Sequence, residues 1–358
     1  MKVIRLLIKT VCLFMMPAVI LSGCGNRTSI TKSAVLMDTV VSVTIYDADR
    51  EELLDECLKK CGEYEHLFSS QIEDSEISNI NQSGGDVVAL SEEMAFLLEK
   101  AETYYSLSGG LFDVSVGQIT ALWDFHGSSP VIPSKQQLES ACRHVGMEYV
   151  DIKGDTLTLL DDQVQLDVGG IAKGYIADLL CEYLVSQGID SGILNLGGNV
   201  RVIGSKPDGD LFSVGLQKPF DAEGEVAASL KISDCSVVTA GTYQRYLEVD
   251  GVRYHHILNP RTGYPADTDL DSATVICEDA VDADALSTIC MLLGQKRAEE
   301  LIASLDGTEA VFISRDGEIS VTDGLILGAD GAWRLAEDET ARGSFGRIFC
   351  LEEYGDGG

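Results

Sequence analysis

Residues 166–175 read Leu166-Asp167-Val168-Gly169-Gly170-Ile171-Ala172-Lys173-Gly174-Tyr175, a predicted strand that runs through two glycines directly into a helix. Glycines let a ligand approach the backbone, and the free N–H groups and dipole of a helix start favour an anion. Lys173 in the first turn adds a full positive charge. The spacing matches neither a P-loop nor a Rossmann fingerprint. The stretch predicts a phosphate-binding junction, and the alternative is a tight turn followed by a solvated lysine.

Around this junction the apolar periodicity predicts both helices and strands. Helices are expected over residues 51–68, 91–107, 171–187, 280–293 and 298–304. Strands are expected over 33–46, 193–203, 212–217, 227–238, 246–258, 272–277 and 310–314, with a hairpin over 157–168 that turns at Asp161-Asp162. Strands outnumber helices and turns join many of them, which indicates an α+β fold with a mixed, largely antiparallel sheet.

The predicted helix over 280–293 carries a possible cation site. Asp284 and Thr288 are four residues apart and share one helix face, so a carboxylate and a hydroxyl can converge on a hard cation. Magnesium usually takes one or two carboxylates and completes its shell with carbonyls, water and phosphate. Alternatively, acids simply favour a helix start, which explains Asp279 and Asp282 but not Thr288.

A third stretch, residues 253–265, places His255-His256 near the end of a strand, before a turn rich in proline and glycine. Neighbouring side chains on a strand point in opposite directions, so the two histidines face different surroundings. A histidine held at a strand end can act as a general base that takes a proton from an attacking hydroxyl. The alternative is a hydrogen-bonded structural histidine.

The amino-terminal residues indicate export. Lys2, Arg5 and Lys9 are followed by an apolar run over 11–21 and then by Ser22-Gly23-Cys24. A small residue before cysteine is the bacterial lipoprotein cleavage pattern, in which Cys24 receives the lipid. A transmembrane anchor is the alternative, but the run is shorter than the ~20 apolar residues that a spanning helix needs. We expect the mature chain to be lipid-anchored to the extracytoplasmic face of the cell membrane.

The composition limits the possible partners. The chain has 26 Lys and Arg against 58 Asp and Glu, a formal net charge of −32, which argues against a nucleic acid partner. A phosphate-bearing substrate would need a local cation, either a metal or a placed lysine, to offset repulsion. Of ten cysteines, Cys12 lies in the signal and Cys24 at the lipid site; the other eight lack C-x-x-C spacing and do not suggest zinc.

Together the three stretches resemble the FAD:protein FMN transferases, the ApbE-type flavin transferases, in their lipoprotein form. Further matching motifs follow in the family's order from about residue 34 to residue 315. They are Met37-Asp38-Thr39, Leu67-Phe68-Ser69 with Ser75-Glu76-Ile77-Ser78, Gly110-Leu111-Phe112-Asp113-Val114-Ser115-Val116-Gly117, Leu122-Trp123-Asp124-Phe125, Leu196-Gly197-Gly198-Asn199 and Thr239-Ala240-Gly241-Thr242-Tyr243. Each motif is weak alone, and their succession carries the resemblance.

The resemblance implies a T-fold-like α+β body that binds FAD in an elongated cleft, with Mg²⁺ at the phosphates. The implied metal site comprises the Gly170 carbonyl, Asp284, Ser287 and Thr288, and the implied catalytic residues are His256, near the reacting phosphate, and Asp284. The implied FAD contacts are Met37, Gln71, Leu111, Phe112, Asp113, Asp167, Lys173 and Leu258. Three positions depart from the family pattern: Asp38 where Gly or Asn is usual, Gln71 where an aromatic ring can occur, and Asn259 where Asp is common.

The implied activity is Mg²⁺-dependent transfer of FMN from FAD to a Ser or Thr hydroxyl of an acceptor flavoprotein, a subunit of a membrane redox complex, with release of AMP. Two other activities are compatible with the sequence: an FAD pyrophosphatase that uses water, and a non-catalytic FAD-binding lipoprotein. The expected organisation is a lipoprotein signal peptide over 1–23, a tether over 24–33, one flavin transferase domain over 34–323 and a weakly ordered tail over 324–358.

Overall fold

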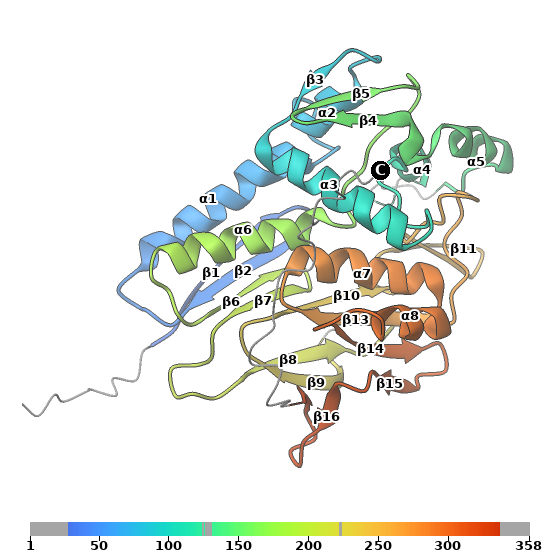
Figure 1. Cartoon of the computed structure of the whole chain (residues 1–358). Coiled ribbons are helices and arrows are strands. Elements are labelled where there is room, and N and C mark those ends of the chain that lie inside the picture. Colours follow the sequence, from blue (N-terminus) through green and yellow to red (C-terminus); the bar gives the residue numbers. More distant parts are fainter. Residues whose placement is uncertain (1–27, 124, 126–130, 222–223, 337–358) are drawn as a thin grey trace, which may run out of the picture.

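The computed structural model describes residues 28–123, 125, 131–221 and 224–336. Its centre is an eight-stranded sheet in which every neighbouring pair is antiparallel (Figure 1). The order is β1 (Ile30–Leu36), β2 (Thr39–Ile45), β6 (Gly192–Leu196), β7 (Asn199–Ile203), β10 (Ser236–Gly241), β13 (Leu270–Cys277), β14 (Glu309–Ser314) and β15 (Ile319–Val321). The predicted α+β class with largely antiparallel sheet is confirmed.

Helices cover one face of this sheet. They are α1 (Glu51–Phe68), α6 (Ala172–Ser186) and α7 (Ala280–Leu293), with α8 (Gln295–Ile302) beside α7 (Figure 1). The helices bury a continuous apolar core against the inward residues of the strands, such as Val43, Leu194 and Val275. Helix α7 is buried along most of its length, so the residues that it carries have fixed positions.

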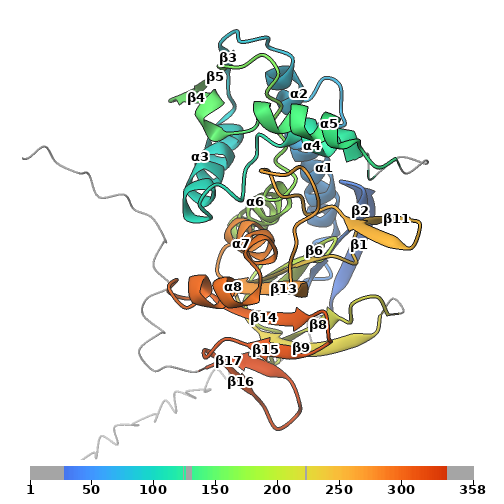
Figure 2. The ribbon, with the colours of Figure 1, turned by 90° about the vertical axis from the view of Figure 1, so that its right-hand side faces the viewer.

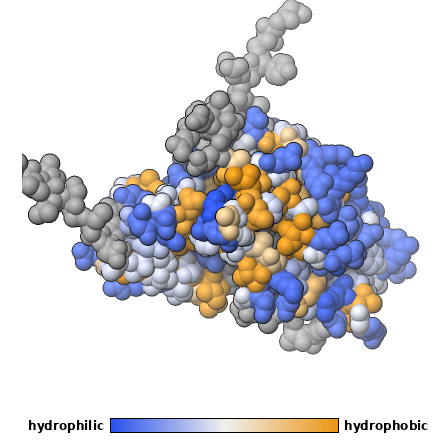
Figure 3. Space-filling view, turned by 90° about the horizontal axis from the view of Figure 1, so that it is seen from below, coloured by the Kyte–Doolittle hydropathy of each residue, from blue (hydrophilic) through white to orange (hydrophobic). Residues whose placement is uncertain are grey.

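The opposite face packs on a second sheet, whose order is β16 (Leu325–Leu327), β17 (Trp333–Leu335), β9 (Val226–Ile232) and β8 (Phe212–Gln217). A separate apolar cluster, which includes Val202, Phe212 and Leu230, joins the two sheets. Figure 3 views the molecule from below, where apolar side chains gather near the centre of the face among polar ones. The exposed apolar side chains of β16 are Ile326 and Leu327.

A third group of elements lies above the helices in Figure 1. It contains a small sheet in the order β3 (Val88–Ala89), β5 (Thr156–Leu159), β4 (Val150–Lys153), and the helices α2 (Glu76–Asn81), α3 (Glu92–Leu107), α4 (Gly117–Trp123), α5 (Lys135–Ala141) and two 3₁₀ turns (Cys142–His144 and Met147–Tyr149). The hairpin β11 (Tyr246–Val249) and β12 (Val252–His255) reaches toward this group.

The predicted helices are confirmed, with α1 and α7 matching to the residue, whereas several predicted strands are wrong. The single strand over 33–46 is the hairpin β1–β2, which turns at Met37 and Asp38, both with positive φ. Asp38 is a residue that turns favour, but it is flanked by no Gly, Pro or Asn, and the strand-like alternation continues through the turn. The predicted strands over 193–203, 227–238 and 246–258 likewise each divide into two.

The hairpin predicted over 157–168 is also wrong. β5 pairs with β4, across a turn at Gly154, and with β3. After β5 the chain leaves the small sheet, and Gln165 makes only an isolated bridge to Val116. The alternation in β5 does correspond to a strand. Its partner β4, however, precedes it in the chain, whereas the predicted partner followed it.

Part of the stretch expected to be a weakly ordered tail is built into the fold. Residues 325–335 form β16 and β17, and Leu325 and Ala332 are each only 5% exposed. The expectation rests on the weak periodicity of this stretch. Strands of only three residues are too short to show a clear alternation, so they give no strand signal. Residues 337–358, the signal over 1–23 and Cys24 lie outside the described residues. Within the described ranges, no helix is both long enough and apolar enough to cross a bilayer.

Candidate active site

A cleft of about 1380 Å³ lies where the helical layer, the central sheet and the upper group meet. Small-molecule pockets usually occupy roughly 300–1,000 Å³, so this cleft has room for a dinucleotide and for part of a second reactant. Its walls include all the residues that the sequence suggested for FAD, namely Met37, Gln71, Leu111, Phe112, Asp113, Asp167, Lys173 and Leu258, together with His256, Gly170, Asp284 and Thr288.

The start of α6 meets the start of α7 at the cleft. The backbone N–H of Gly174 donates to the Asp284 carboxylate at 2.9 Å. A Cβ atom on Gly174 would lie only 2.2 Å from the Ala280 carbonyl oxygen, so only glycine permits this approach. In return Asp178 of α6 accepts from the N–H groups of Ala280 and Val281, at 2.9 and 2.8 Å. Each helix therefore satisfies free N–H groups of the other.

The same junction brings Gly170 next to α7. A Cβ atom on Gly170 would lie 3.9 Å from the Thr288 hydroxyl oxygen and 3.3 Å from the Phe112 ring. Two stretches more than a hundred residues apart thus share one wall of the cleft, as the sequence suggested. Ser287 does not reach it: the residue is 1% exposed, and its hydroxyl donates to the Asp284 carbonyl at 2.9 Å.

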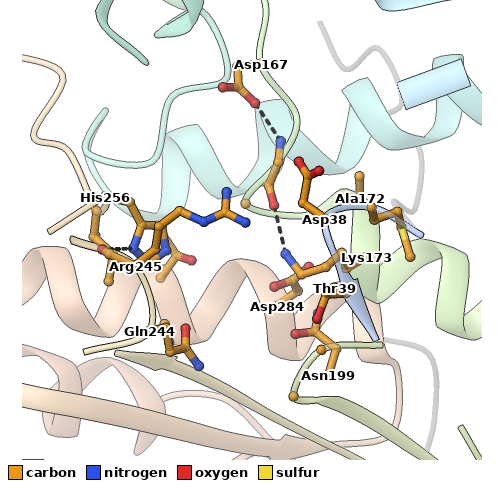
Figure 4. A pocket seen from close by; sticks show the side chains of 18 of the residues that line it. Asp38, Thr39, Asp167, Ala172, Lys173, Asn199, Gln244, Arg245, His256 and Asp284 are labelled. Carbon is orange, nitrogen blue, oxygen red and sulfur yellow. Dashed lines mark hydrogen bonds between the residues drawn. The ribbon is translucent and has the colours of Figure 1, made fainter. Parts of the chain in front are cut away.

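Asp167 and Lys173 lie on either side of the glycine turn (Figure 4). The Asp167 carboxylate accepts from the Gly169 N–H at 2.9 Å and from the Thr120 hydroxyl at 2.8 Å. The Lys173 ammonium lies 3.4 Å from the Gly169 carbonyl oxygen. The aspartate thus fixes the turn, and the lysine extends along it into the cleft, where it can face a phosphate.

The upper wall is shaped by local side-chain hydrogen bonds. The Ser108 hydroxyl accepts from the N–H groups of Leu111 and Phe112, at 3.2 and 2.9 Å. The Asp113 carboxylate accepts from the N–H and hydroxyl of Ser115, at 2.8 and 2.6 Å, and burial raises its pKa. These bonds hold a loop without regular structure in a fixed shape beside the cleft.

The β1–β2 turn forms the opposite wall and explains one departure from the family pattern. Met37 and Asp38 have φ of 51° and 55°, and the Met37 N–H donates to Glu65 at 2.8 Å. Gly or Asn adopts this left-handed conformation most readily, and Asp tolerates it through its short polar side chain. The Gly or Asn that the resemblance implies at position 38 would suit this backbone conformation.

His256 lies in the loop after β12, with Arg245 beside it (Figure 4). Its Nδ1 is 3.1 Å from the Arg245 carbonyl oxygen. A carbonyl oxygen only accepts, so this contact favours a proton on Nδ1 and leaves Nε2 as an acceptor. Burial lowers the pKa of His256 to about 3, so the ring is neutral at ordinary pH. A neutral imidazole with a free acceptor nitrogen suits a general base by geometry.

The loop that follows His256 is fixed from two sides. The Trp123 indole donates to the Gly263 carbonyl at 2.7 Å, and the Arg261 guanidinium donates to the Gly109 carbonyl at 2.6 Å. The Asn259 side chain accepts from the Arg261 N–H at 2.9 Å, so Asn259 shapes this turn. The motif around Trp123 therefore supports the position of His256 and Leu258 from outside the cleft.

His255 has a structural role, and its burial predicts a pH effect. It is 7% exposed, its Nε2 lies 3.2 Å from the Ala266 carbonyl, and burial lowers its pKa from 6.5 to about 4. Between these values the unfolded chain binds more protons than the folded chain, so the free energy of unfolding falls as the pH falls from 6.5 to 4. The contribution of His255 is about 3 kcal/mol.

This pH effect can be tested by urea unfolding of the unaltered chain and of His255→Gln at pH 7 and pH 4. The free energy of unfolding should depend less on pH in the variant than in the unaltered chain. An equal dependence in the two proteins would contradict this assignment.

Charge in the cleft is predominantly negative. In the described part of the chain its lining includes the acidic residues Asp38, Glu65, Asp113, Asp167 and Asp284, but only Lys173 and Arg245 as cationic side chains. Placing a diphosphate beside these carboxylates requires an additional cation. Arg245 was not identified from the sequence, although it follows the quoted motif over 239–243 by two residues; one arginine after a strand carries no spacing signal of its own.

Comparison with known proteins matches this chain to the ApbE family model over residues 37–312. It is 31% identical to the FAD:protein FMN transferase of Treponema pallidum over 328 residues, which cover 85% of this chain and 90% of the relative. It is 34% identical to an FAD:protein FMN transferase of Klebsiella pneumoniae over 292 residues, which cover 80% and 90%.

Solved structures show the same architecture. The ApbE protein of Thermotoga maritima superposes with a TM-score of 0.77 at 30% identity, covering 83% of this chain and 97% of that structure. The flavin transferase ApbE of Vibrio cholerae superposes with a TM-score of 0.75 at 28% identity, covering 83% and 97%. The shared fold extends over almost all of each solved structure and over most of this chain.

Proposed function

Because this chain belongs to the ApbE family, we propose that it is a Mg²⁺-dependent FAD:protein FMN transferase that attaches FMN to a Ser or Thr hydroxyl of an acceptor flavoprotein. Transfer of FMN from FAD to a protein agrees with the names of its relatives. The observation that carries the proposal is the meeting of α6 and α7, where Lys173, Asp284 and Thr288 face one cleft of dinucleotide size.

The oxygen atoms at this junction fit magnesium. The Gly170 carbonyl, the Asp284 carboxylate and the Thr288 hydroxyl are hard ligands, and a single carboxylate is typical of a Mg²⁺ site completed by water and phosphate. Bound there, magnesium would withdraw charge from the diphosphate and offset the acidic cleft.

The residues of the chain supply positioning and proton transfer. Lys173 would hold the diphosphate, and Arg245 adds charge on the His256 side. The acceptor hydroxyl oxygen forms a bond to the phosphorus that carries riboflavin, the bond from that phosphorus to the bridging oxygen breaks, and AMP leaves with the electron pair. The hydroxyl proton passes to Nε2 of His256.

The direct test is incubation of the chain with FAD, Mg²⁺ and an apo acceptor domain that carries a Ser or Thr target, followed by mass spectrometry. A covalent FMN increment on the acceptor with release of AMP supports the transferase. FMN and AMP in solution without labelled protein would indicate a pyrophosphatase, and intact FAD after long incubation would indicate a binding lipoprotein.

We also propose that Cys24 carries the lipid and that the enzyme works at the extracytoplasmic face of the cell membrane, on a subunit of a membrane redox complex. The support is the motif Leu21-Ser22-Gly23-Cys24 after a basic and apolar start. Cys24→Ala should abolish incorporation of labelled palmitate and should leave the apolar leader attached, which intact-mass measurement detects. Normal labelling of the variant would contradict the assignment of Cys24.

A further inference from the structure

An acceptor protein has to bring its hydroxyl to an interior phosphate, so it must contact the mouth of the cleft. We propose that it docks on an acceptor rim formed by Phe220, Tyr246 and Arg253. This inference rests on the proposed transfer to a protein. It adds the surface that recognises the acceptor and the kind of segment that fits it.

The acceptor rim joins two hairpins that are separate in the chain. Phe220 lies between β8 and β9, whereas Tyr246 and Arg253 belong to β11 and β12. The Phe220 and Tyr246 ring centroids are 6.0 Å apart at 67°, and the Arg253 guanidinium lies over both rings at 4.5 and 5.2 Å. Figure 2 shows the two hairpins projecting from the same side of the molecule.

The rim is continuous with the proposed reaction centre. Phe220 also contacts the ring of Tyr243 at 6.0 Å, and Tyr243 lines the cleft. Tyr246 follows Arg245 directly and pairs with His255, the neighbour of His256, in the β11–β12 register. A segment that lies on the rim would therefore lie beside the strands that lead to the groups proposed to act on its hydroxyl.

The exposure of the rim favours a protein partner over a purely structural role. Phe220 is 43% exposed and Tyr246 37%. Phe220 also has φ of 57°, a left-handed conformation that is costly for a bulky residue. Strained residues concentrate at functional sites, aromatic and Arg side chains are enriched in protein interfaces, and Tyr and Arg are frequent among the residues that contribute most binding energy.

The chemistry of the rim defines the occupant. The rim offers aromatic faces and a guanidinium plane, and Arg253 is already paired with Glu248 at 2.9 Å. Such a surface suits an apolar or aromatic side chain of the acceptor. The occupant is therefore an extended acceptor segment in which a bulky apolar residue lies near the target Ser or Thr.

Phe220→Gly provides a sharp test, because glycine suits a positive φ better than phenylalanine does. The variant should keep its thermal stability and its Kd for FAD. Its kcat/KM for a protein acceptor should fall at least tenfold, mainly through KM. The probe is an apo flavoprotein domain chosen because the unaltered chain flavinylates one of its threonines.

Two further variants serve as controls. Phe220→Tyr retains the ring and should restore most of the transfer. Leu327→Ala removes an apolar side chain that is 58% exposed on β16, outside the rim, and should change nothing. An unchanged KM for the acceptor in Phe220→Gly would contradict the docking role of the rim but not the proposed function. A loss of FAD binding as large as the loss of transfer would do the same. A chain that labels no protein would contradict the proposed function and the rim together.

Discussion

The Asp284→Asn variant should lose FMN transfer by a factor of about 10²–10³ and should keep its fold. Removing one charge that holds a catalytic cation removes about 3–4 kcal/mol of transition-state stabilisation. Asparagine keeps a side-chain oxygen for the Gly174 N–H, which the Asp284 carboxylate accepts at 2.9 Å in the unaltered chain. The helix junction should therefore survive the substitution.

The measurement is the transfer rate as a function of Mg²⁺ concentration, together with titration of Mg²⁺ into the FAD complex. The variant should require more Mg²⁺ and bind it more weakly. Asp279→Asn is the matched control, because Asp279 lies at the start of the same helix, is not among the cleft-lining residues and makes no side-chain cap hydrogen bond. Full activity of Asp284→Asn at low Mg²⁺ would refute the metal site.

The Gly174→Ala variant should lose about 2–3 kcal/mol of unfolding free energy and most of its activity. The added methyl group would lie 2.2 Å from the Ala280 carbonyl oxygen and 2.8 Å from the Asp284 Cβ atom, so α6 and α7 must separate. Overpacking of this kind typically costs 1–3 kcal/mol. Separation would also move Asp284 away from Lys173, which links the loss of stability to the loss of transfer.

Denaturant unfolding and the transfer assay would be compared with those of Gly62→Ala. Gly62 is also helical, but a Cβ atom there would meet only the Leu36 side chain at an ordinary 3.8 Å. Alanine is favoured over glycine in a helix interior by ~1 kcal/mol, so this control should be at least as stable as the unaltered chain. Equal behaviour of the two variants would show that the helix contact at Gly174 is not critical.

The helices could be predicted from the sequence because their starts and ends are encoded locally. Ser91 accepts from the Met94 N–H at the start of α3, and Gly188 follows the end of α6. The hairpins could not, because the turn at Met37 and Asp38 contains a single turn-favouring residue, Asp38, within an unbroken strand-like alternation. Pairing between distant strands, such as β10 with β7 and β13, leaves no trace in a local pattern.

The residues of the candidate site likewise divide into those with a local sequence signal and those without one. Gly170, Lys173, Asp284 and Thr288 were identified because a glycine-rich helix start and a helix face have recognisable spacing. Ser287 was included by position in the motif, and the structure turns its hydroxyl toward the Asp284 carbonyl instead. Arg245 and the rim residue Phe220 became visible only when the fold placed them beside His256 and Tyr243.

The mutual capping of α6 and α7 ties catalytic competence to completion of the whole domain. Asp178 and Ala280 are separated by 102 residues, so their bond closes a long loop and cannot form in an amino-terminal fragment. A chain that still lacks α7 has no assembled place for the dinucleotide. FAD would then bind and stabilise only the fully folded chain. Partly folded chains would not bind FAD.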